Sequence, residues 1–175
     1  MEGAYKLGAV SPECADDPSV FNLPLREQVE VFLDEHRTAL NNCLDGLTEE
    51  QVRRRTVPSS TTLLGLVKHS AFVERVWFGE AVTGQSRQEL GIVAGPTESF
   101  ELEPTDTIES VRASHRLAWE QSRGATSSLS LDDLITGNRR GPLPLRWVYL
   151  HVLRELAQHC GHADILREQI LAERP

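Results

Sequence analysis

The stretch LRWVYLHVLRELAQHCGHADILRE, residues 145–168, contains three of the six histidines of the chain. If the stretch is helical, each residue advances by about 100° around the axis, so that three histidines and one glutamate share a band of about 80°. These four residues are His151, Glu155, His159 and His162. Val148 and Leu166 lie in the same band, which predicts that it faces the protein interior. Burial of an acid with several imidazoles is unfavourable unless the groups pair or bind a metal.

Upstream of this stretch, apolar residues recur at helical spacing in three further segments. We expect long helices at residues 24–47, 61–82 and 106–124, and from residue 144 or 145 almost to the end of the sequence. Thr48, followed three residues later by Gln51, has the pattern of a capping box and predicts a short helix after Gly46. No run of strand length alternates with period two. The sequence therefore predicts an all-α fold, an up-down-type four-helix bundle.

The segments between these helices differ in length and composition. Residues 83–106 contain scattered glycines and prolines without clear periodicity, so we expect a long crossover loop between helices two and three. The segment SLDDL, residues 130–134, is expected to add a turn of helix before the turn-rich segment TGNRRGPLP. Residues 1–21 are expected to form a tail or a strap, and residues 22–175 a single domain.

The composition narrows the class of protein. A formal net charge of −8 argues against a nucleic-acid partner, because binding to phosphates requires a basic surface. No apolar run reaches the roughly 20 residues that a membrane span requires. The three cysteines are odd in number and widely separated, which indicates neither a disulfide framework nor a cysteine-based zinc site. We therefore expect a cytoplasmic protein that binds neither nucleic acid nor membranes.

Glu155 and His159 have the spacing and chemistry of a partial metal site. Residues four apart on a helix reach the same patch of a neighbouring helix. Imidazole nitrogen and carboxylate oxygen are ligands for zinc, nickel and iron. His69 is the candidate for a third ligand, because it lies in the apolar stripe of the segment 61–82. Polar residues that face the core from different helices are the way in which metal centres of helical bundles are built.

Each of these residues also has an ordinary structural explanation. A histidine on an apolar helix face is often a hydrogen-bonded core residue, and a glutamate and a histidine four residues apart often form a helix-stabilising pair. His36 and His115 lie near apolar stripes without acidic or imidazole neighbours, so we expect core or boundary residues there. Spacing alone leaves metal binding and these alternatives open.

The segment LLGLVKHSAFVERVWF, residues 63–78, and the stretch 145–168 resemble the two signature segments of the DinB-like four-helix-bundle metalloprotein family, in particular its actinobacterial branch of small proteins. The resemblance implies a divalent metal held by His69, Glu155 and His159. Glutamate at the first position of the last-helix motif is similar to the ligand set of mycothiol-dependent maleylpyruvate isomerase, whose metal is zinc. Zinc is therefore the expected metal, with nickel or iron as alternatives.

Further residues are expected around the metal. The resemblance places His162 and Asp164 at positions that members of the branch commonly share, and we expect His162 to contact a ligand rather than the metal. His151 is expected to line the same pocket. Three arginines just before the last helix are candidates to bind an anionic group of a cosubstrate, although loop arginines are more often simply solvated. These are Arg139, Arg140 and Arg146.

The resemblance implies thiol-dependent transferase chemistry. A low-molecular-weight thiol, such as mycothiol, would bind the metal, lose its proton and attack an electrophile. A metal-dependent hydrolase that activates water is an alternative. A non-catalytic metal- or ligand-binding module of a stress response is another. The expected partners are a small-molecule thiol and an electrophile, and a homodimer is expected because bundles of this type often pair.

Overall fold

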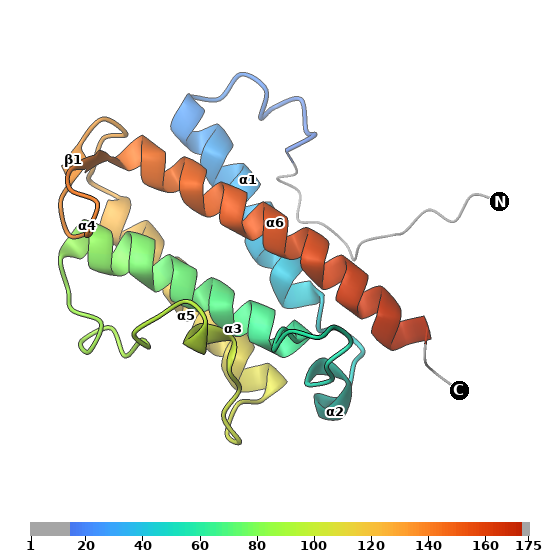
Figure 1. Ribbon diagram of the computed structural model, residues 1–175. Helices are drawn as coiled ribbons and strands as arrows, with labels where there is room; N and C mark the ends of the chain where they lie inside the picture. The colour runs from blue at the N-terminus through green and yellow to red at the C-terminus, as the bar shows by residue number, and fades with distance from the viewer. Residues whose placement is uncertain (1–14, 173–175) are drawn as a thin grey trace.

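Four long helices form the bundle that the computed structural model shows for residues 15–172 (Figure 1). They are α1 (Leu25–Asn42), α3 (Leu63–Glu74), α5 (Ile108–Thr126) and α6 (Leu145–Ala172). The all-α fold predicted from the sequence is thereby confirmed. None of the described helices is long and apolar enough to cross a membrane. The predicted tail falls largely outside the described residues, and within its described part Val20 is buried.

Helices α1 and α6 lie side by side and run in the same direction (Figure 1). Near their starts, Arg26 Nη2 on α1 donates to the Tyr149 hydroxyl on α6 at 3.2 Å. At the other end, Arg167 Nη1 on α6 donates to the Cys43 carbonyl at 2.6 Å, directly after α1. Because both contacts advance together along the two helices, the pair is parallel.

Helices α3 and α5 run opposite to this pair and parallel to each other (Figure 1). Lys68 forms an ion pair with Asp106 just before α5, at 2.8 Å. Further along both segments, Arg75 Nη2 donates to Ser114 Oγ at 2.9 Å. Two consecutive parallel helices require a long connection, and residues 84–107 provide it. This connection is the predicted crossover loop, and it includes the short 3₁₀ helix η2 (Glu98–Phe100).

The second helix is not a single regular α-helix. It begins at α3, where Thr62 Oγ1 accepts from the Gly65 N–H at 3.0 Å, continues through the π-helix η1 (Arg75–Glu80) and ends with α4 (Ala81–Thr83). Gly84 terminates it in the left-handed conformation, with φ of 75°. The π segment, which widens the helix and shifts the following side chains around the axis, was not predicted.

Among the remaining predictions of secondary structure, one is confirmed and two are corrected. Helix α2 (Glu49–Val52) follows the predicted Thr48 capping box. The first helix ends at Asn42 rather than near residue 47. The predicted helical turn at residues 130–134 is wrong, because β1 (Leu134–Ile135) pairs antiparallel with β2 (Leu143–Pro144) there. Asp133 Oδ2 accepts from the Ser130 N–H at 2.8 Å, and residues 131–132 form a turn that does not continue into a helix.

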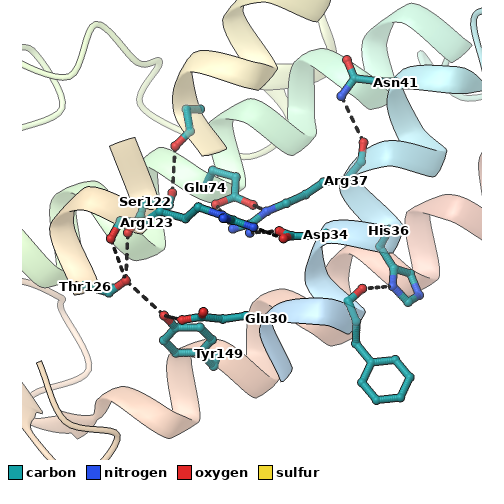
Figure 2. Close-up of polar contacts among 12 residues, drawn as sticks. Glu30, Asp34, His36, Arg37, Asn41, Glu74, Ser122, Arg123, Thr126 and Tyr149 are labelled. Atoms are coloured by element: carbon teal, nitrogen blue, oxygen red, sulfur yellow. Dashed lines mark hydrogen bonds and ion pairs between the residues drawn. The ribbon is translucent and has the colours of Figure 1, made fainter. Parts of the chain in front are cut away.

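A buried polar layer crosses the apolar core (Figure 2). Arg37 of α1 donates from Nε and Nη2 to the two carboxylate oxygens of Glu74 in α3, at 2.7 and 2.8 Å. Asp34 accepts a further bond from Arg37 at 3.0 Å. The Glu74 side chain is fully buried and only 3% of the Arg37 side chain is exposed, so the pair lies inside the protein. The contact ties α1 to α3.

Candidate metal centre

His69 of α3 meets Glu155 and His159 of α6 inside the bundle. One potential ligand atom from each residue lies within 4.8 Å of the other two. Within α6, His159 Nε2 lies 3.8 Å from Glu155 Oε2. The two imidazole rings, contributed by different helices, lie 4.8 Å apart at their centroids and nearly perpendicular, at 84°. The structure therefore brings together the three residues that the sequence singled out as ligands.

The apolar face of α6 positions its two members of this group. Leu156 and Ala163 flank His159 on the buried side of the helix and are both almost fully buried. His159 follows them inward and is 8% exposed. Glu155, one turn earlier, is half-buried with 24% of its side chain exposed. The group thus has an inner end at the histidines and an outer end at the carboxylate.

Ser99 of η2 determines which nitrogen of His69 is available. Its Oγ donates to the Pro96 carbonyl at 2.6 Å and lies 2.6 Å from His69 Nδ1. Because the hydroxyl proton is used on Pro96, the oxygen accepts from a protonated Nδ1. His69 Nε2 then carries the lone pair that a metal requires. A hydrogen bond of this kind is the usual support of a metal-binding histidine.

A glycine lets the crossover loop approach His69 closely. A Cβ placed on Gly65 would lie 2.7 Å from the Phe100 carbonyl oxygen, closer than such atoms pack. The absence of a side chain there allows η2 to lie directly against α3. Phe100 can therefore stack on the His69 ring, with 3.9 Å between centroids and 13° between planes. Gly65 thus permits the approach of η2 that brings Ser99 and Phe100 against the His69 ring.

The two histidines are held in the neutral form that binds metals. Burial lowers the pKa of His69 to about 3, and the neighbouring His159 acts in the same direction. Burial also lowers the pKa of His159, although Glu155 opposes the shift. Both rings are therefore unprotonated at neutral pH, with no proton to displace before a metal binds.

The surroundings of His159 fit a bound divalent metal. Both of its ring nitrogens are buried and have no hydrogen-bond partner in the described part of the chain. Buried polar atoms without partners are rare, and each needs an explanation such as an ion or a water molecule. Two imidazole nitrogens and a carboxylate oxygen are a donor set for zinc, nickel or iron. A metal coordinated by His159 would satisfy one of the two nitrogens.

Residues 28–172 match the family model described as mycothiol S-transferase. The chain belongs to the mycothiol S-transferase family. This family is DinB-like, which confirms the resemblance recognised in the two signature segments. No curated protein gave a significant match. The matched range includes α3 and α6 entirely, so all three members of the candidate metal centre lie within it.

Two further α6 histidines of this mycothiol S-transferase family member lie next to the group. His151 is half-buried, and its Nε2 is 3.9 Å from Glu155 Oε1. His162 is exposed, with its ring centroid 5.7 Å from that of His159. Both residues therefore neighbour a candidate ligand, and neither belongs to the group of ligand atoms found among the described residues.

Asp164 lies apart from the candidate ligands. It is exposed on α6. Burial raises the pKa of Cys160 to about 12, and Asp164 adds to this rise. Cys160 faces α1, since its Sγ lies 3.5 Å from the His36 carbonyl. The structure therefore places Asp164 on the side of Cys160 and not with the metal group.

An aromatic wall extends from Glu155 toward the start of α6. It consists of Trp77 on η1 and of Trp147 and His151 on α6. Trp147 stacks on His151 with 4.9 Å between centroids and 8° between planes. The Trp77 and His151 ring centroids lie 4.4 Å apart. The wall was not predicted from the sequence, although Trp147, His151 and Glu155 share the spacing of four that places residues on one helix face.

The three candidate arginines for anion binding have different surroundings. The Arg140 guanidinium lies 5.8 Å from the Trp77 ring centroid and 5.7 Å from that of Trp147. Arg146 forms an ion pair with Asp132. Arg139 is exposed. Only Arg140, of these three, is placed by the structure on the wall that leads to the candidate metal centre.

Proposed function

We propose that the chain binds a divalent metal through His69, Glu155 and His159, and that it transfers a low-molecular-weight thiol such as mycothiol to an electrophile. Zinc is the metal that we propose first, and nickel or iron would suit the same donors. The observation that carries the proposal is the buried His159 ring, which has no hydrogen-bond partner among residues 15–172 and whose Nε2 lies 3.8 Å from Glu155 Oε2. Membership of the mycothiol S-transferase family supports a mycothiol-like thiol as the cosubstrate.

The number of protein ligands favours catalysis over a structural role. Structural zinc sites are usually closed by four protein ligands, whereas catalytic sites use three and keep a position for water or substrate. The described residues supply three such ligands here. The positive charge of a divalent metal in this position would stabilise the thiolate form of a bound thiol at neutral pH.

The protein's own residues prepare this chemistry. Ser99 holds the His69 ring in one tautomer. Phe100 covers one face of that ring and keeps water away from it. Glu155 brings a negative charge to the outer end of the group, where a substrate arrives from solvent. These residues keep the donor atoms neutral or anionic and in fixed directions before any substrate binds.

The nucleophilic thiol would come from the cosubstrate. Burial raises the pKa of Cys43 to about 12, and burial has the same effect on Cys160. Thiols with such pKa values carry almost no thiolate at neutral pH and are poor nucleophiles. In the proposed reaction the cosubstrate thiol loses its proton and its sulfur forms a bond to an electrophilic carbon. The electrophile then releases a leaving group or, in an addition, takes up a proton.

We further propose a cytoplasmic homodimer. Cys43 and Cys160 are free thiols, as expected in a reducing compartment. Phe32 of α1 and Leu150 and Ile165 of α6 are large apolar side chains on the outside of the parallel helix pair. Their contact with a second copy would remove this apolar surface from water. Analytical ultracentrifugation tests the dimer, and a monomer at all concentrations contradicts it.

Turnover assays with and without thiol test the proposed reaction. Zinc-loaded protein is incubated with mycothiol and an electrophile, and conjugate formation is followed by mass spectrometry. We expect a rate above the uncatalysed one, lost after chelation and restored by zinc. Ester hydrolysis without thiol would instead support a metal-dependent hydrolase. Metal binding without turnover of either kind would leave a binding module and contradict the proposal.

A further inference from the structure

Arg140 has an unusual position for an arginine in a connecting segment. Its guanidinium lies against two indole rings, those of Trp77 and Trp147, at 5.8 and 5.7 Å from their centroids. The two rings lie 5.4 Å apart and come from different helices. Cations are attracted to indole faces, which also restrict the conformations of the arginine side chain. The charge is therefore held at a defined place and remains exposed to solvent.

The segment that carries Arg140 is anchored to the second helix. The Gly137 N–H donates to the Ala81 carbonyl at 3.0 Å. A side chain at Gly137 would collide with the Glu80 and Ala81 carbonyls, so only glycine permits this approach. Asn138 Oδ1 accepts from the Arg140 N–H at 2.9 Å. Contacts with η1 and α4 and a local turn thus position Arg140 beside the tryptophans.

The tryptophans connect Arg140 with the candidate metal centre. Trp147 stacks on His151 at 4.9 Å, and His151 Nε2 lies 3.9 Å from Glu155 Oε1. A small molecule that covers Trp147 and His151 would therefore have one end at the Arg140 charge and the other end at the metal group. This is the arrangement needed to hold one part of a substrate while another part reacts.

The charge of Arg140 is not neutralised within the described part of the chain. No carboxylate of residues 15–172 forms an ion pair with its guanidinium, whereas Arg146 pairs with Asp132 and Arg154 with Glu155. A guanidinium group presents two parallel N–H donors that match the two oxygens of a carboxylate. An unpaired guanidinium beside a reaction centre is therefore suited to bind a carboxylate of a substrate.

We propose that Arg140, Trp77 and Trp147 form a recognition site for a carboxylate carried by one of the two substrates. The guanidinium binds the carboxylate, and the indoles cover the adjoining apolar or planar part of the molecule. This inference rests on the proposed thiol transfer for its consequence in catalysis. The carboxylate belongs either to the thiol or to the electrophile, and kinetics with matched substrates distinguish the two.

The binding of benzoate tests the site without any turnover. The three indole N–H signals of ¹⁵N-labelled, metal-free protein are assigned by single tryptophan-to-phenylalanine substitutions and followed during titration. We expect benzoate to shift the signals of Trp77 and Trp147 saturably while that of Trp119 stays in place. Neutral benzamide has the same ring without the charge and should cause no comparable shift. Equal responses to benzoate and benzamide would overturn the proposal.

Substitution of two adjacent arginines provides the matched control. Arg140→Gln should weaken benzoate binding about tenfold or more, as expected for loss of a charge-assisted pair. Arg139→Gln removes the same charge from the same segment and should leave benzoate binding unchanged. Arg140→Lys keeps the charge without the two parallel N–H donors and should give an intermediate affinity for benzoate. If the Arg139 and Arg140 variants bind benzoate alike, the effect is one of net charge and the site is refuted.

Two substrate pairs identify the source of the carboxylate. N-acetylcysteine is compared with N-acetylcysteamine, and 3-maleimidopropionate with N-ethylmaleimide, on zinc-loaded protein. Arg140→Gln should raise KM about tenfold for the carboxylate-bearing member of one pair and leave kcat unchanged. Unchanged KM values for all four compounds would overturn the inference. Absence of thiol transfer together with Arg140-dependent benzoate binding would instead refute the proposed function and leave the carboxylate site standing.

Discussion

Ser99 Oγ lies 2.6 Å from His69 Nδ1 and connects the crossover loop to the candidate metal centre. The two residues are 30 positions apart in the sequence. The contact gives part of the long loop a definite role, because the serine fixes the direction of the His69 lone pair. Loops of this length without regular structure are often functional, and we propose that this loop orients the His69 ring as a metal ligand.

Removal of the Ser99 hydroxyl should weaken metal binding. Ser99→Ala leaves Nδ1 of His69 without its acceptor and allows the ring to rotate, so zinc affinity should fall about 10- to 100-fold. Competition with a chromophoric chelator measures the change. Ser128→Ala, a substitution at an exposed serine, serves as the control. Equal zinc affinities in the two variants would show that Ser99 does not support the ligand.

Zinc affinity should also depend on the close approach of η2 to α3 at Gly65. Gly65→Ala forces η2 away from α3, because the new methyl group overlaps the Phe100 carbonyl. We expect a destabilisation of about 1–3 kcal/mol and a weaker zinc affinity, measured by urea unfolding and chelator competition. Gly95→Ala adds a methyl group with no atom within 4 Å and should change neither quantity. A fully stable Gly65→Ala protein with normal zinc affinity would contradict the assignment.

Breaking the Arg37–Glu74 pair should destabilise the fold without affecting the metal centre. Glu74→Leu leaves the buried Arg37 without its main partner and should lower the free energy of unfolding by about 3–5 kcal/mol. Arg37→Met combined with Glu74→Leu removes both charges and should recover much of the loss. Urea denaturation measures both variants. A double variant less stable than Glu74→Leu alone would contradict this account, and zinc affinity of the folded variants should stay unchanged.

His115 should make stability depend on pH. Burial lowers its pKa from 6.5 to about 4, and Asn41 Nδ2 donates to its Nδ1 at 2.7 Å, which favours the neutral ring. The unfolded chain therefore takes up a proton between pH 6.5 and 4 that the folded protein does not. Stability should be full above pH 6.5 and fall by up to about 3 kcal/mol as the pH is lowered to 4.

A variant without the imidazole isolates this contribution from those of the other histidines. His115→Leu should show a smaller loss of unfolding free energy between pH 7 and pH 4 than the unsubstituted protein, measured by urea unfolding at each pH. His69 and His159 also have lowered pKa values and contribute the same sign in both proteins. Identical pH profiles would show that His115 is already protonated in the folded state or is not buried.

The α6 part of the candidate site follows from helical periodicity. The spacing of Glu155 and His159 places both side chains on one helix face, and neighbouring apolar residues indicate that this face is buried. Assigning His69 as their partner required a second inference, that an inward-facing histidine of another helix lies opposite them. The resemblance to a family with the same arrangement supported this step, and the structure shows the three residues together.

Residues whose role depends on tertiary packing were not predictable in this way. Ser99 and Gly65 act through a contact between a loop and a helix, and no local sequence pattern predicts this contact. Trp77 reaches the wall from the π-helix, whose altered periodicity no regular helical wheel reproduces. The strands at Leu134 and Leu143 are two residues long, too short to leave an alternating pattern. Local chemistry therefore predicted the helices and the ligand types, and packing determined the rest.

Metal retention is the measurement that tests the central claim most directly. Purified protein and the His69→Ala and His159→Ala variants are exposed to zinc and nickel at neutral pH, freed of unbound metal by gel filtration and analysed by mass spectrometry. His36→Ala, at a histidine of α1 outside the group, is the matched control. We expect about one metal ion per chain in the unsubstituted protein and the control, and much less in the two variants. If the unsubstituted protein retains no more metal than His69→Ala and His159→Ala, then these residues do not form a metal centre.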